Sequence, residues 1–410
     1  MDTHLAQLAI NGGSPTRTMP LPGEGGRAMG REEIEALTQV IESGQLGRHG
    51  GTFVKHLERG FAEGYGVKHA IAVSSGSAAV HTCIATINPE PGDEIVTTPC
   101  SDFGTILGIL FQNAIPVFAD LDPETFCVDP ASVEAKITPR TKAILAVHLF
   151  GGLADVDRLR EIADRHSIPL IEDCAQTQLA ELNGRLAGTI GDLASFSLNN
   201  TKHLNAGEGG VVLTNNDVYA QRARLFADKA WPREEKDRYS MFLGQNYRLN
   251  ELSAAVAVVG LRRLTENVAN RRRAVERIHA GLHDVPGVRV PKTVVGARSS
   301  YWILHLLLEP GYDADVVAEA LRAEGIPFGA RYVSPLYTWP VLSERQTYGE
   351  SGFPFNSPYT ERPFDYAPGL CPIFEAAREQ LIVLGIDERW SEADADDVVA
   401  AIRKVLVRLR

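Results

Sequence analysis

The chain has 410 residues, of which 44% are hydrophobic and 23% are charged, as expected for a globular protein of two domains. Its formal net charge of -11 argues against nucleic acid or an anionic membrane as a partner, because either would need a basic surface. The five cysteines are scattered without a C-x-x-C pair, so we expect neither a disulfide framework nor a zinc site. No signal peptide and no apolar stretch of ~20 residues is visible, so we expect a cytoplasmic protein.

Along the chain, residues 1–30 are rich in glycine and proline and predict an irregular arm, and residues 31–64 predict helices that break at "GQLGRHGG". From residue 68, short apolar strands alternate with helices. The expected strands cover 68–75, 94–99, 115–122, 141–150 and 168–174, and the expected helices cover 77–87, 105–113 and 156–167. Repeated units of this kind with nearly continuous apolar strands predict an α/β fold, with a mostly parallel sheet covered by helices on both faces.

A long helical pattern over residues 249–283 follows and would link two domains. Beyond it we expect a smaller α/β domain. Its predicted elements are strands at 299–308 and 326–332, a helix at 313–325, and a final helix that starts at Ser391 with Asp394 completing a capping box. The predicted organisation is therefore an arm (1–30), a large domain (31–265) and a small C-terminal domain (266–410).

Polar residues gather where the predicted strands of the large domain end. They are Ser74 to Ser77, Asp173, Ser197 and the loop that holds Lys202. In parallel sheets, ligands bind beyond the carboxyl ends of the strands. This convergence is the first indication of a functional site.

Lys202 lies in the stretch "SLNNTKHLNAGEGG" (197–210), between two apolar segments that have the pattern of buried strands. A solvated lysine near a turn is the more common case, and for Lys202 alone we favour it. The alternative is a Schiff-base lysine, whose amine must be uncharged to attack a carbonyl. Burial would lower its pKa from an unperturbed value of ~10.4 and so favour that chemistry.

Two neighbouring motifs shift this balance. Asp173 closes a strand, where a carboxylate is either a helix cap or salt-bridge member, or the partner of a protonated pyridine nitrogen in a pyridoxal phosphate enzyme. The run from Ser74 to Ala78 passes from a strand directly into a helix, where backbone N–H groups can bind an anion, although a serine N-cap without a ligand gives the same pattern. It is neither a Walker loop nor a G-x-G-x-x-G fingerprint, so nucleotide-dependent functions lose support.

The order of five motifs resembles the DegT/DnrJ/StrS family of pyridoxal phosphate-dependent sugar and aminocyclitol aminotransferases, over about residues 31–265. That resemblance implies the fold of the aspartate aminotransferase class, fold type I, and a homodimer with active sites at its interface. The short N-terminal stretch "LAINGGSPTR" (8–17) resembles the start of aminocyclitol-forming members. The five motifs are "SSGSAAV" (74–80), "AVHLFGG" (146–152), "IEDCAQ" (171–176), "GRLAGTIGDLASFSLNNTKHLNAGEGG" (184–210) and "GQNYRLNELSAA" (244–255).

The resemblance implies roles for individual residues. Lys202 matches the lysine that holds the cofactor, Asp173 the carboxylate at the ring nitrogen, and Gln176 the residue at the cofactor's phenolic oxygen. Asn246 resembles the asparagine that reaches the phosphate of the neighbouring subunit. Phe103 falls where an aromatic ring stacks on the pyridine, unless it is a core residue. The residues that match the phosphate contacts are Gly76, Ser77 and Ser197.

Four positions depart from the family pattern. Asp102 replaces a small residue such as threonine, Gln178-Leu179 replaces a frequent His-Gly, and Arg331-Tyr332 replaces a frequent His-Tyr. We expect Asp102, Gln178 and Arg331 to line the substrate pocket, although for Arg331 a salt bridge is about as plausible. Cys174 replaces an alanine beside the aspartate and is expected to pack as a small hydrophobe. No metal ligands are expected.

The predicted activity is a ping-pong aminotransfer, from glutamate or glutamine to a keto sugar or keto cyclitol, in a biosynthetic pathway such as that of an antibiotic. Lys202 would serve as general base and acid. Three alternatives stay open. They are the dehydratase branch of the family, in which histidine replaces the lysine; the aminobenzoate-forming branch; and a cofactor-binding regulator without turnover.

Overall fold

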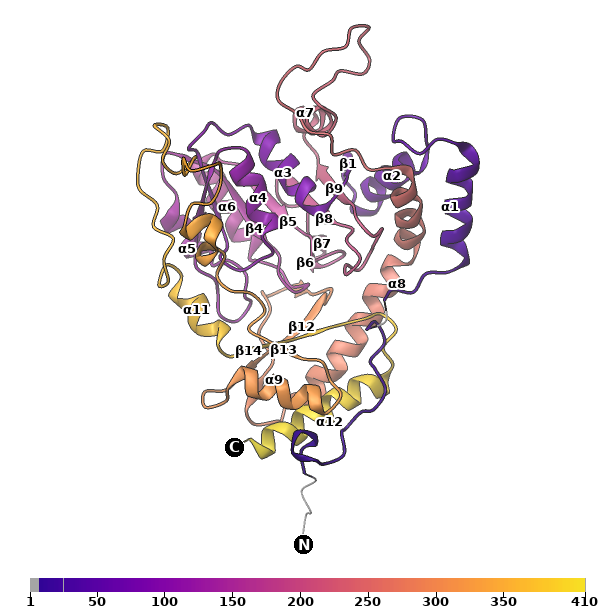
Figure 1. The fold of residues 1–410 in the computed structure, drawn as a ribbon, viewed down its shortest axis with the longest axis vertical. Coiled ribbons are helices and arrows are strands. Elements are labelled where there is room, and N and C mark those ends of the chain that lie inside the picture. The colour runs from indigo at the N-terminus through magenta and orange to yellow at the C-terminus, as the bar shows by residue number, and fades with distance from the viewer. Residues whose placement is uncertain (1–6, 25, 410) are drawn as a thin grey trace.

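The computed structural model describes residues 7–24 and 26–409. Residues 1–6 and Gly25, which belong to the predicted arm, lie outside the described residues. Two sheets of unequal size, each with its own hydrophobic core, form the body of the molecule (Figure 1). Within the described chain, no helix combines the length and the apolar character needed to cross a membrane.

The larger sheet has seven strands in the order β1-β9-β8-β5-β4-β2-β3 in the described chain. The pairs β2–β3, β2–β4, β4–β5 and β5–β8 are parallel, whereas β9 runs antiparallel to both β8 and β1. The mostly parallel sheet that the sequence predicts is therefore confirmed, and its antiparallel pairs lie at one edge, where β8 and β9 form a hairpin around the loop of Lys202. The strands are β1 (His69–Val73), β2 (Glu94–Thr97), β3 (Ile115–Phe118), β4 (Thr141–Val147), β5 (Leu170–Asp173), β8 (Leu193–Ser197) and β9 (Gly210–Thr214).

Helices flank this sheet, and the last of them along the chain is the 32-residue helix α8. Within α3, every residue from Ala78 to Ile87 is buried, and this is why its sequence is apolar almost all round. Ser75 caps α3 by accepting a hydrogen bond from the Ala78 N–H. The helices α5 and α7 were not predicted from the sequence. The helices are α1 (Arg31–Ser43), α2 (Phe53–Tyr65), α3 (Gly76–Ile87), α4 (Gly104–Phe111), α5 (Pro130–Lys136), α6 (Val156–His166), α7 (Asp217–Ala227) and α8 (Glu251–Leu282).

The smaller sheet has the order β10-β12-β14-β13, and α9 and α12 pack beside it. Its core includes Leu8 and Leu21, so part of the N-terminal segment packs here. Ser391 and Asp394 form the predicted capping box of α12. A three-stranded sheet, β11-β6-β7, joins the two bodies. The elements are β6 (Glu181–Leu182), β7 (Arg185–Leu186), β10 (Val288–Arg289), β11 (Ala297–Arg298), β12 (Ile303–Leu308), β13 (Gly329–Ala330), β14 (Leu381–Gly385), α9 (Ala314–Ala323), α10 (Pro340–Ser343), α11 (Pro372–Arg378), α12 (Glu392–Arg408) and the 3-10 helices Ala9–Asn11 and Leu336–Thr338.

One predicted strand of the small domain is mostly wrong. The segment 326–332 contributes only the two residues of β13, because Arg331 and Tyr332 have φ angles of 62° and 50°, in the left-handed region that ends a strand. Several residues between Leu336 and Phe374 pack with the core of the larger sheet. The boundary predicted at residue 265 falls within α8 and stays a prediction.

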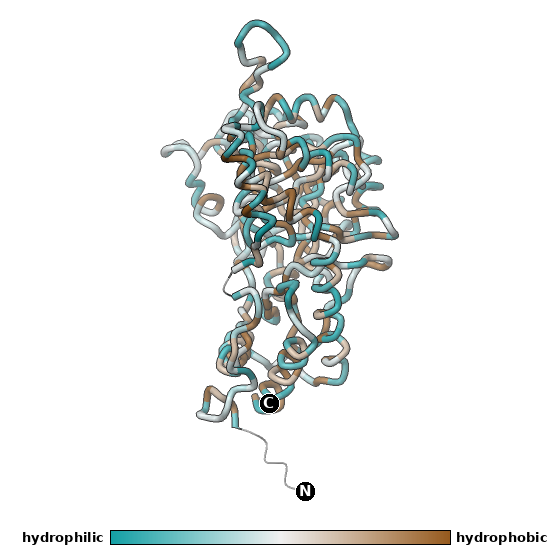
Figure 2. The backbone as a smooth tube through the Cα atoms, turned by 90° about the vertical axis from the view of Figure 1, so that its right-hand side faces the viewer, coloured by the Kyte–Doolittle hydropathy of each residue, from teal (hydrophilic) through white to brown (hydrophobic). Residues whose placement is uncertain are grey.

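A long loop between α7 and α8 extends from one end of the molecule (Figure 1). It is largely hydrophilic, whereas hydrophobic residues gather inside the two bodies (Figure 2). Asn246 lies at the return of this loop, where it forms an isolated β-bridge with Asp228 and is exposed.

Candidate functional site

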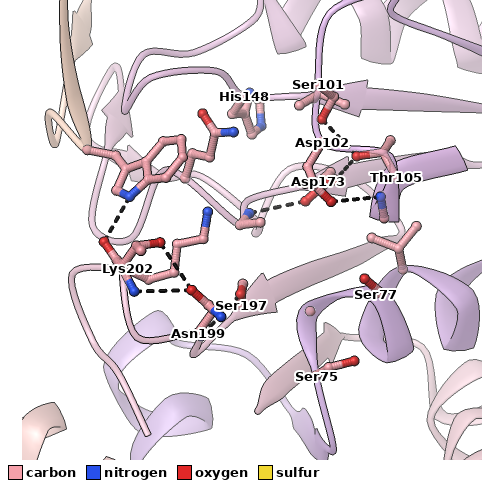
Figure 3. A pocket seen from close by; sticks show the side chains of 18 of the residues that line it. Ser75, Ser77, Ser101, Asp102, Thr105, His148, Asp173, Ser197, Asn199 and Lys202 are labelled. Carbon is pink, nitrogen blue, oxygen red and sulfur yellow. Dashed lines mark hydrogen bonds between the residues drawn. The ribbon is translucent and has the colours of Figure 1, made fainter. Parts of the chain in front are cut away.

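A cavity of about 290 Å³ lies where the carboxyl ends of β4, β5 and β8 meet the N-terminus of α3. This is the edge at which the sequence predicts a site. The structure brings seven of the predicted site residues to its wall, and Figure 3 shows several of them around the same space. These seven are Gly76, Ser77, Asp102, Asp173, Gln176, Ser197 and Lys202.

One end of the cavity is built for an anion. The first N–H groups of α3 have no partner within the helix, and Gly76 and Ser77 place them at the cavity wall. A Cβ on Gly76 would lie 2.7 Å from the Cβ of Ser197, so only glycine lets these two segments approach. A Cβ on Gly104 would likewise lie 2.5 Å from Oγ of Ser77. The two glycines therefore keep a small, hydroxyl-lined space open.

Asp173 lies on the floor of the cavity and is only 3% exposed. Thr105 Oγ1 donates to its Oδ2 at 2.9 Å, and the Ala175 N–H donates to its Oδ1 at 3.1 Å. Ser101 hydrogen-bonds Thr105 in turn, at 2.8 Å. Burial raises the pKa of Asp173 above its ordinary value, and the hydrogen bonds from Thr105 and Ala175 oppose that rise. A cationic group in the cavity would offset the cost of burying this carboxylate.

Lys202 faces the cavity from the loop between β8 and β9 and is 9% exposed. The loop turns tightly because Gly207 has a φ of 77° and the Lys202 N–H donates to the Asn199 carbonyl at 2.9 Å. Burial lowers the pKa of Lys202 to about 8, and the carboxylates of Asp173 and Asp102 act against that shift. At pH 7 about one-tenth of this amine is therefore uncharged, far more than for an ordinary lysine.

Trp302 forms the wall beside the lysine. The Lys202 amine lies 3.7 Å from the centre of the Trp302 ring, within the range of a cation–π contact. The indole N–H donates to the Thr201 carbonyl at 2.9 Å, so the ring is tied to the loop it contacts. Sequence reasoning missed Trp302, because it lies 100 residues away, just before β12, and nothing in its local sequence marks it.

Gln176 and Tyr332 close another side. Gln176 accepts a hydrogen bond from the Phe150 N–H at 2.8 Å and donates to the Tyr332 hydroxyl at 3.3 Å. Burial raises the pKa of Tyr332, so its hydroxyl keeps its proton and can donate it to a ligand. Tyr332 lines the cavity, and its φ of 50° lies in the left-handed region.

Four predicted site residues do not line the cavity. Phe103 instead stacks on Trp339, with ring centres 5.3 Å apart, and Asn246 lies on the exposed loop. Gln178 is fully buried: it donates to the Ser197 carbonyl at 2.9 Å and accepts from the Leu204 N–H at 2.8 Å, which holds both ends of the lysine loop. Arg331 pairs with Asp315 and Glu379 outside the cavity. Gln178 and Arg331 therefore do not line this cavity, and of the two alternatives given for Arg331 the structure shows the salt bridge.

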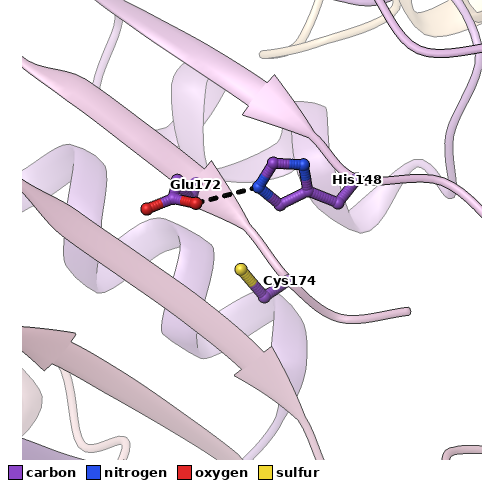
Figure 4. A group of neighbouring side chains, drawn as sticks. All are labelled: His148, Glu172 and Cys174. Carbon is purple, nitrogen blue, oxygen red and sulfur yellow. Dashed lines mark hydrogen bonds and ion pairs between the residues drawn. The ribbon is translucent and has the colours of Figure 1, made fainter. Parts of the chain in front are cut away.

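His148, Glu172 and Cys174 lie together (Figure 4), and His148 also lines the cavity. The Ala154 N–H donates to Nδ1 of His148 at 3.1 Å, so Nε2 carries the proton and donates to Glu172 at 2.9 Å. Burial raises the pKa of Glu172, but the hydrogen bonds from His148 and the 188–191 loop outweigh it and lower the pKa below its ordinary value. Burial also keeps the Cys174 thiol protonated by raising its pKa. The group is therefore a hydrogen-bonded support, not a set of free metal ligands.

Comparison with known proteins adds family relationships to this geometry. Residues 27–403 match the profile of the DegT/DnrJ/EryC1/StrS aminotransferase family. The chain is 36% identical to an L-glutamine:2-deoxy-scyllo-inosose aminotransferase of Streptoalloteichus tenebrarius, with 97% of each chain covered. It is 33% identical to a GDP-perosamine synthase of Caulobacter vibrioides, covering 87% of this chain and 91% of that protein. Among solved structures, 3-amino-5-hydroxybenzoic acid synthase superposes with a TM-score of 0.85 at 27% identity, covering 96% of this chain and all of that one.

Proposed function

The chain belongs to the DegT/DnrJ/EryC1/StrS aminotransferase family, and from this premise we propose how its cavity works. It is an aminotransferase that uses pyridoxal 5'-phosphate to move an amino group from glutamine or glutamate to a keto cyclitol or keto sugar. One observation carries the proposal. A buried lysine amine with a lowered pKa and a buried carboxylate with a raised pKa face the same cavity.

The residues present fit this cofactor. The N-terminus of α3 and the Ser77 and Ser197 hydroxyls offer donors for a phosphate, in the space that Gly76 keeps open. The buried Asp173 carboxylate suits a protonated ring nitrogen, and Lys202 supplies the amine for covalent attachment. Gln176 can donate to a phenolic oxygen. These contacts support the assignment of Gly76, Ser77, Asp173, Gln176, Ser197 and Lys202 to cofactor binding.

When bound, pyridoxal phosphate supplies a carbonyl that takes up the amino group and a ring that accepts electrons. Asp173 stabilises the protonated ring nitrogen by an ion pair inside a site of low polarity. Lys202 moves the proton at the amino-bearing carbon, since an amine with a pKa of about 8 can both accept and release a proton near neutral pH. Trp302 and Tyr332 hold this amine and the substrate away from bulk water.

The substrate assignment rests on the relatives. Six relatives at 32–36% identity are named for glutamine and an inosose, and this supports a cyclic polyhydroxylated ketone as acceptor. Asp102 adds a carboxylate at the cavity that can accept hydrogen bonds from ring hydroxyls. Such a site discriminates strongly, because a substrate without the matching hydroxyl leaves the polar group unpaired.

We further propose a homodimer with shared sites. Lys202 is the one cationic side chain, lysine or arginine, that lines the cavity in the described chain, so a bound phosphate would rely on neutral donors, and a further donor from a second copy would complete its site. Asn246 lies on an exposed loop of its own chain, which suits a contact with the site of a second copy. The five cysteines are buried and free in the described chain, in keeping with a reducing compartment such as the cytoplasm.

Covalent trapping tests the proposal. Pyridoxal 5'-phosphate followed by borohydride should leave a reduced adduct on Lys202, located by peptide mapping, and Lys202→Ala should bind the cofactor without an adduct. Because the neutral amine attacks, the rate of attachment should rise with pH about a midpoint near 8. An adduct on another lysine, or none, would refute the proposal.

A further inference from the structure

Asp102 has an incomplete set of partners at the edge of the cavity. Its Oδ1 accepts the Gly104 N–H at 2.8 Å, at the start of α4. In the part of the chain that the structure describes, neither a hydrogen bond nor an ion pair engages its Oδ2. The side chain is exposed, lines the cavity with Asp173 and Lys202 (Figure 3), and is close enough for its charge to act on Lys202. One carboxylate oxygen is therefore free to meet a ligand.

The other carboxylates that line the cavity are already engaged or stand on the exposed side of the lysine loop, so Asp102 is the one best placed to contact a ligand. The Asp173 carboxylate is engaged by Thr105 and Ala175 on the floor. Glu208 accepts a hydrogen bond from Asn199 at 3.1 Å and stands on the exposed side of the lysine loop. Within the described lining no arginine faces the cavity, so no guanidinium is at hand to bind a carboxylate on a substrate's side chain.

We propose that Asp102 selects glutamine over glutamate as the amino donor, an inference that rests on the proposed function. In a ping-pong reaction the donor and the acceptor occupy the same cavity in turn. The side-chain amide of glutamine can donate an N–H to the free oxygen of Asp102, whereas the side-chain carboxylate of glutamate is repelled by it. The same oxygen can accept hydrogen bonds from the hydroxyl groups of a cyclic polyol. One residue therefore favours uncharged hydrogen-bond donors in both half-reactions.

Asp102 attracts the side-chain amide of glutamine and repels the side-chain carboxylate of glutamate. Two like charges a few ångströms apart at a partly exposed site are expected to change relative affinity by roughly tenfold or more. Repulsion between exposed charges weakens as salt screens it, over a Debye length of ~10 Å at 0.1 M. The disadvantage of glutamate should therefore shrink as ionic strength rises, and that dependence is a signature that a packing role for Asp102 would not produce.

The test compares wild type with Asp102→Asn. Asparagine keeps an oxygen for the Gly104 N–H and removes the charge, so the thermal unfolding midpoint serves as a check on the fold. Glu208→Gln is the matched control, because it removes a carboxylate from the same cavity at a position already hydrogen-bonded to Asn199. Stopped-flow absorbance of the cofactor-loaded protein gives kcat/KM for each donor in the first half-reaction, at low and at high salt.

We expect wild type and Glu208→Gln to prefer glutamine by about tenfold or more, with the preference falling as salt is raised. Asp102→Asn should lose most of the preference, chiefly by gaining rate with glutamate, and should lose its salt dependence. A preference that survives unchanged in Asp102→Asn, or a wild type that uses both donors equally, overturns the inference and leaves the proposed function standing. A wild type that reacts with neither donor overturns both.

Discussion

Burial shifts the pKa values of the two central ionisable side chains of the cavity in opposite directions. It lowers the pKa of Lys202 to about 8 and raises the pKa of Asp173, so each group is moved toward its neutral form. The lysine gains nucleophilic character from this shift. The carboxylate becomes a group that is stabilised by a cation, such as a protonated ring nitrogen. The pair is therefore suited to a ligand that carries a cationic group for Asp173 and a carbonyl for Lys202.

The Asp173→Asn substitution tests this at the scale of one residue. Asparagine can hydrogen-bond Thr105 and Ala175 but cannot form an ion pair with a protonated ring nitrogen. We expect the first half-reaction with glutamine to slow by roughly 100-fold or more, at ~1.4 kcal/mol for each factor of ten, with little change in circular dichroism. Stopped-flow rates within a few-fold of wild type would contradict the role assigned to Asp173.

At this scale the sequence predicts the residues that belong to local motifs. Lys202, Asp173 and Gly76 each follow a strand or begin a helix, so their place at the sheet edge can be inferred from chain order. Trp302 and Tyr332 reach the cavity from the other body, and Trp302 carries no local signal. For the pair Arg331-Tyr332, the sequence points to Arg331 and not to the tyrosine that lines the cavity. Gln178 belongs to a motif, yet its side chain hydrogen-bonds the backbone of the lysine loop and does not reach the cavity. Motif membership therefore does not distinguish a residue that touches a ligand from one that holds the loop.

At the scale of elements, Glu172 fixes the segment that leads into β8. Its carboxylate accepts the His148 Nε2–H and the N–H groups of Gly188, Ile190 and Gly191, at 2.6–2.9 Å. It is completely buried. A buried carboxylate with this many donors is stable only while all of them are in place. Glu172 therefore positions the strand that carries Ser197 and the lysine loop.

The Glu172→Gln substitution should be costly. The amide nitrogen would face the N–H groups that now bind Oε1 or Oε2, so the free energy of unfolding should fall by about 3 kcal/mol. Urea unfolding measures this. The control is Glu134→Gln, which breaks an exposed pair with Arg165 and should leave the urea midpoint close to that of wild type. Equal effects of the two substitutions would show that Glu172 has no special structural role.

Periodicity predicts most elements of the larger sheet, because buried parallel strands and their helices have strong patterns. It fails at short or irregular pieces. The strand β13 is cut to two residues by left-handed backbone at Arg331, and the short strands β6, β7 and β11 pair into a sheet that the sequence does not predict. These outcomes depend on loop geometry and tertiary pairing, and local apolar patterns carry little information on either.

At the scale of the whole molecule, the N-terminal segment and the exposed loop extend the two bodies in different ways. The buried Glu324 side chain accepts hydrogen bonds from Ala9 and Thr16 and pairs with Lys404, so the N-terminal segment is tied to the smaller body. The loop that ends at Asn246 is largely hydrophilic and extends from one end of the molecule (Figures 1 and 2). We propose that this loop completes the cavity of a second copy.

Complementation between two damaged chains tests the shared site. Lys202→Ala chains mixed with Asn246→Ala chains should form heterodimers with one doubly damaged site and one intact site. In an equal mixture with full exchange, half of the dimers are heterodimers, so about a quarter of all sites should be intact. The activity per site should therefore reach about a quarter of the wild-type value, well above either variant alone. If activity stays at the level of the parents despite subunit exchange shown by native mass spectrometry, Asn246 does not act across the interface.

The central claim is that this cavity transfers an amino group to a cyclic polyhydroxylated ketone through Lys202. The most direct measurement supplies the cofactor-loaded protein with glutamine labelled with ¹⁵N at its α-amino group, and with 2-deoxy-scyllo-inosose or pyruvate as acceptor, and follows the label by mass spectrometry. We expect labelled aminocyclitol to form much faster than labelled alanine, and no labelled product with Lys202→Ala. Label in alanine at an equal or higher rate, or label in the cyclitol without Lys202, would contradict it.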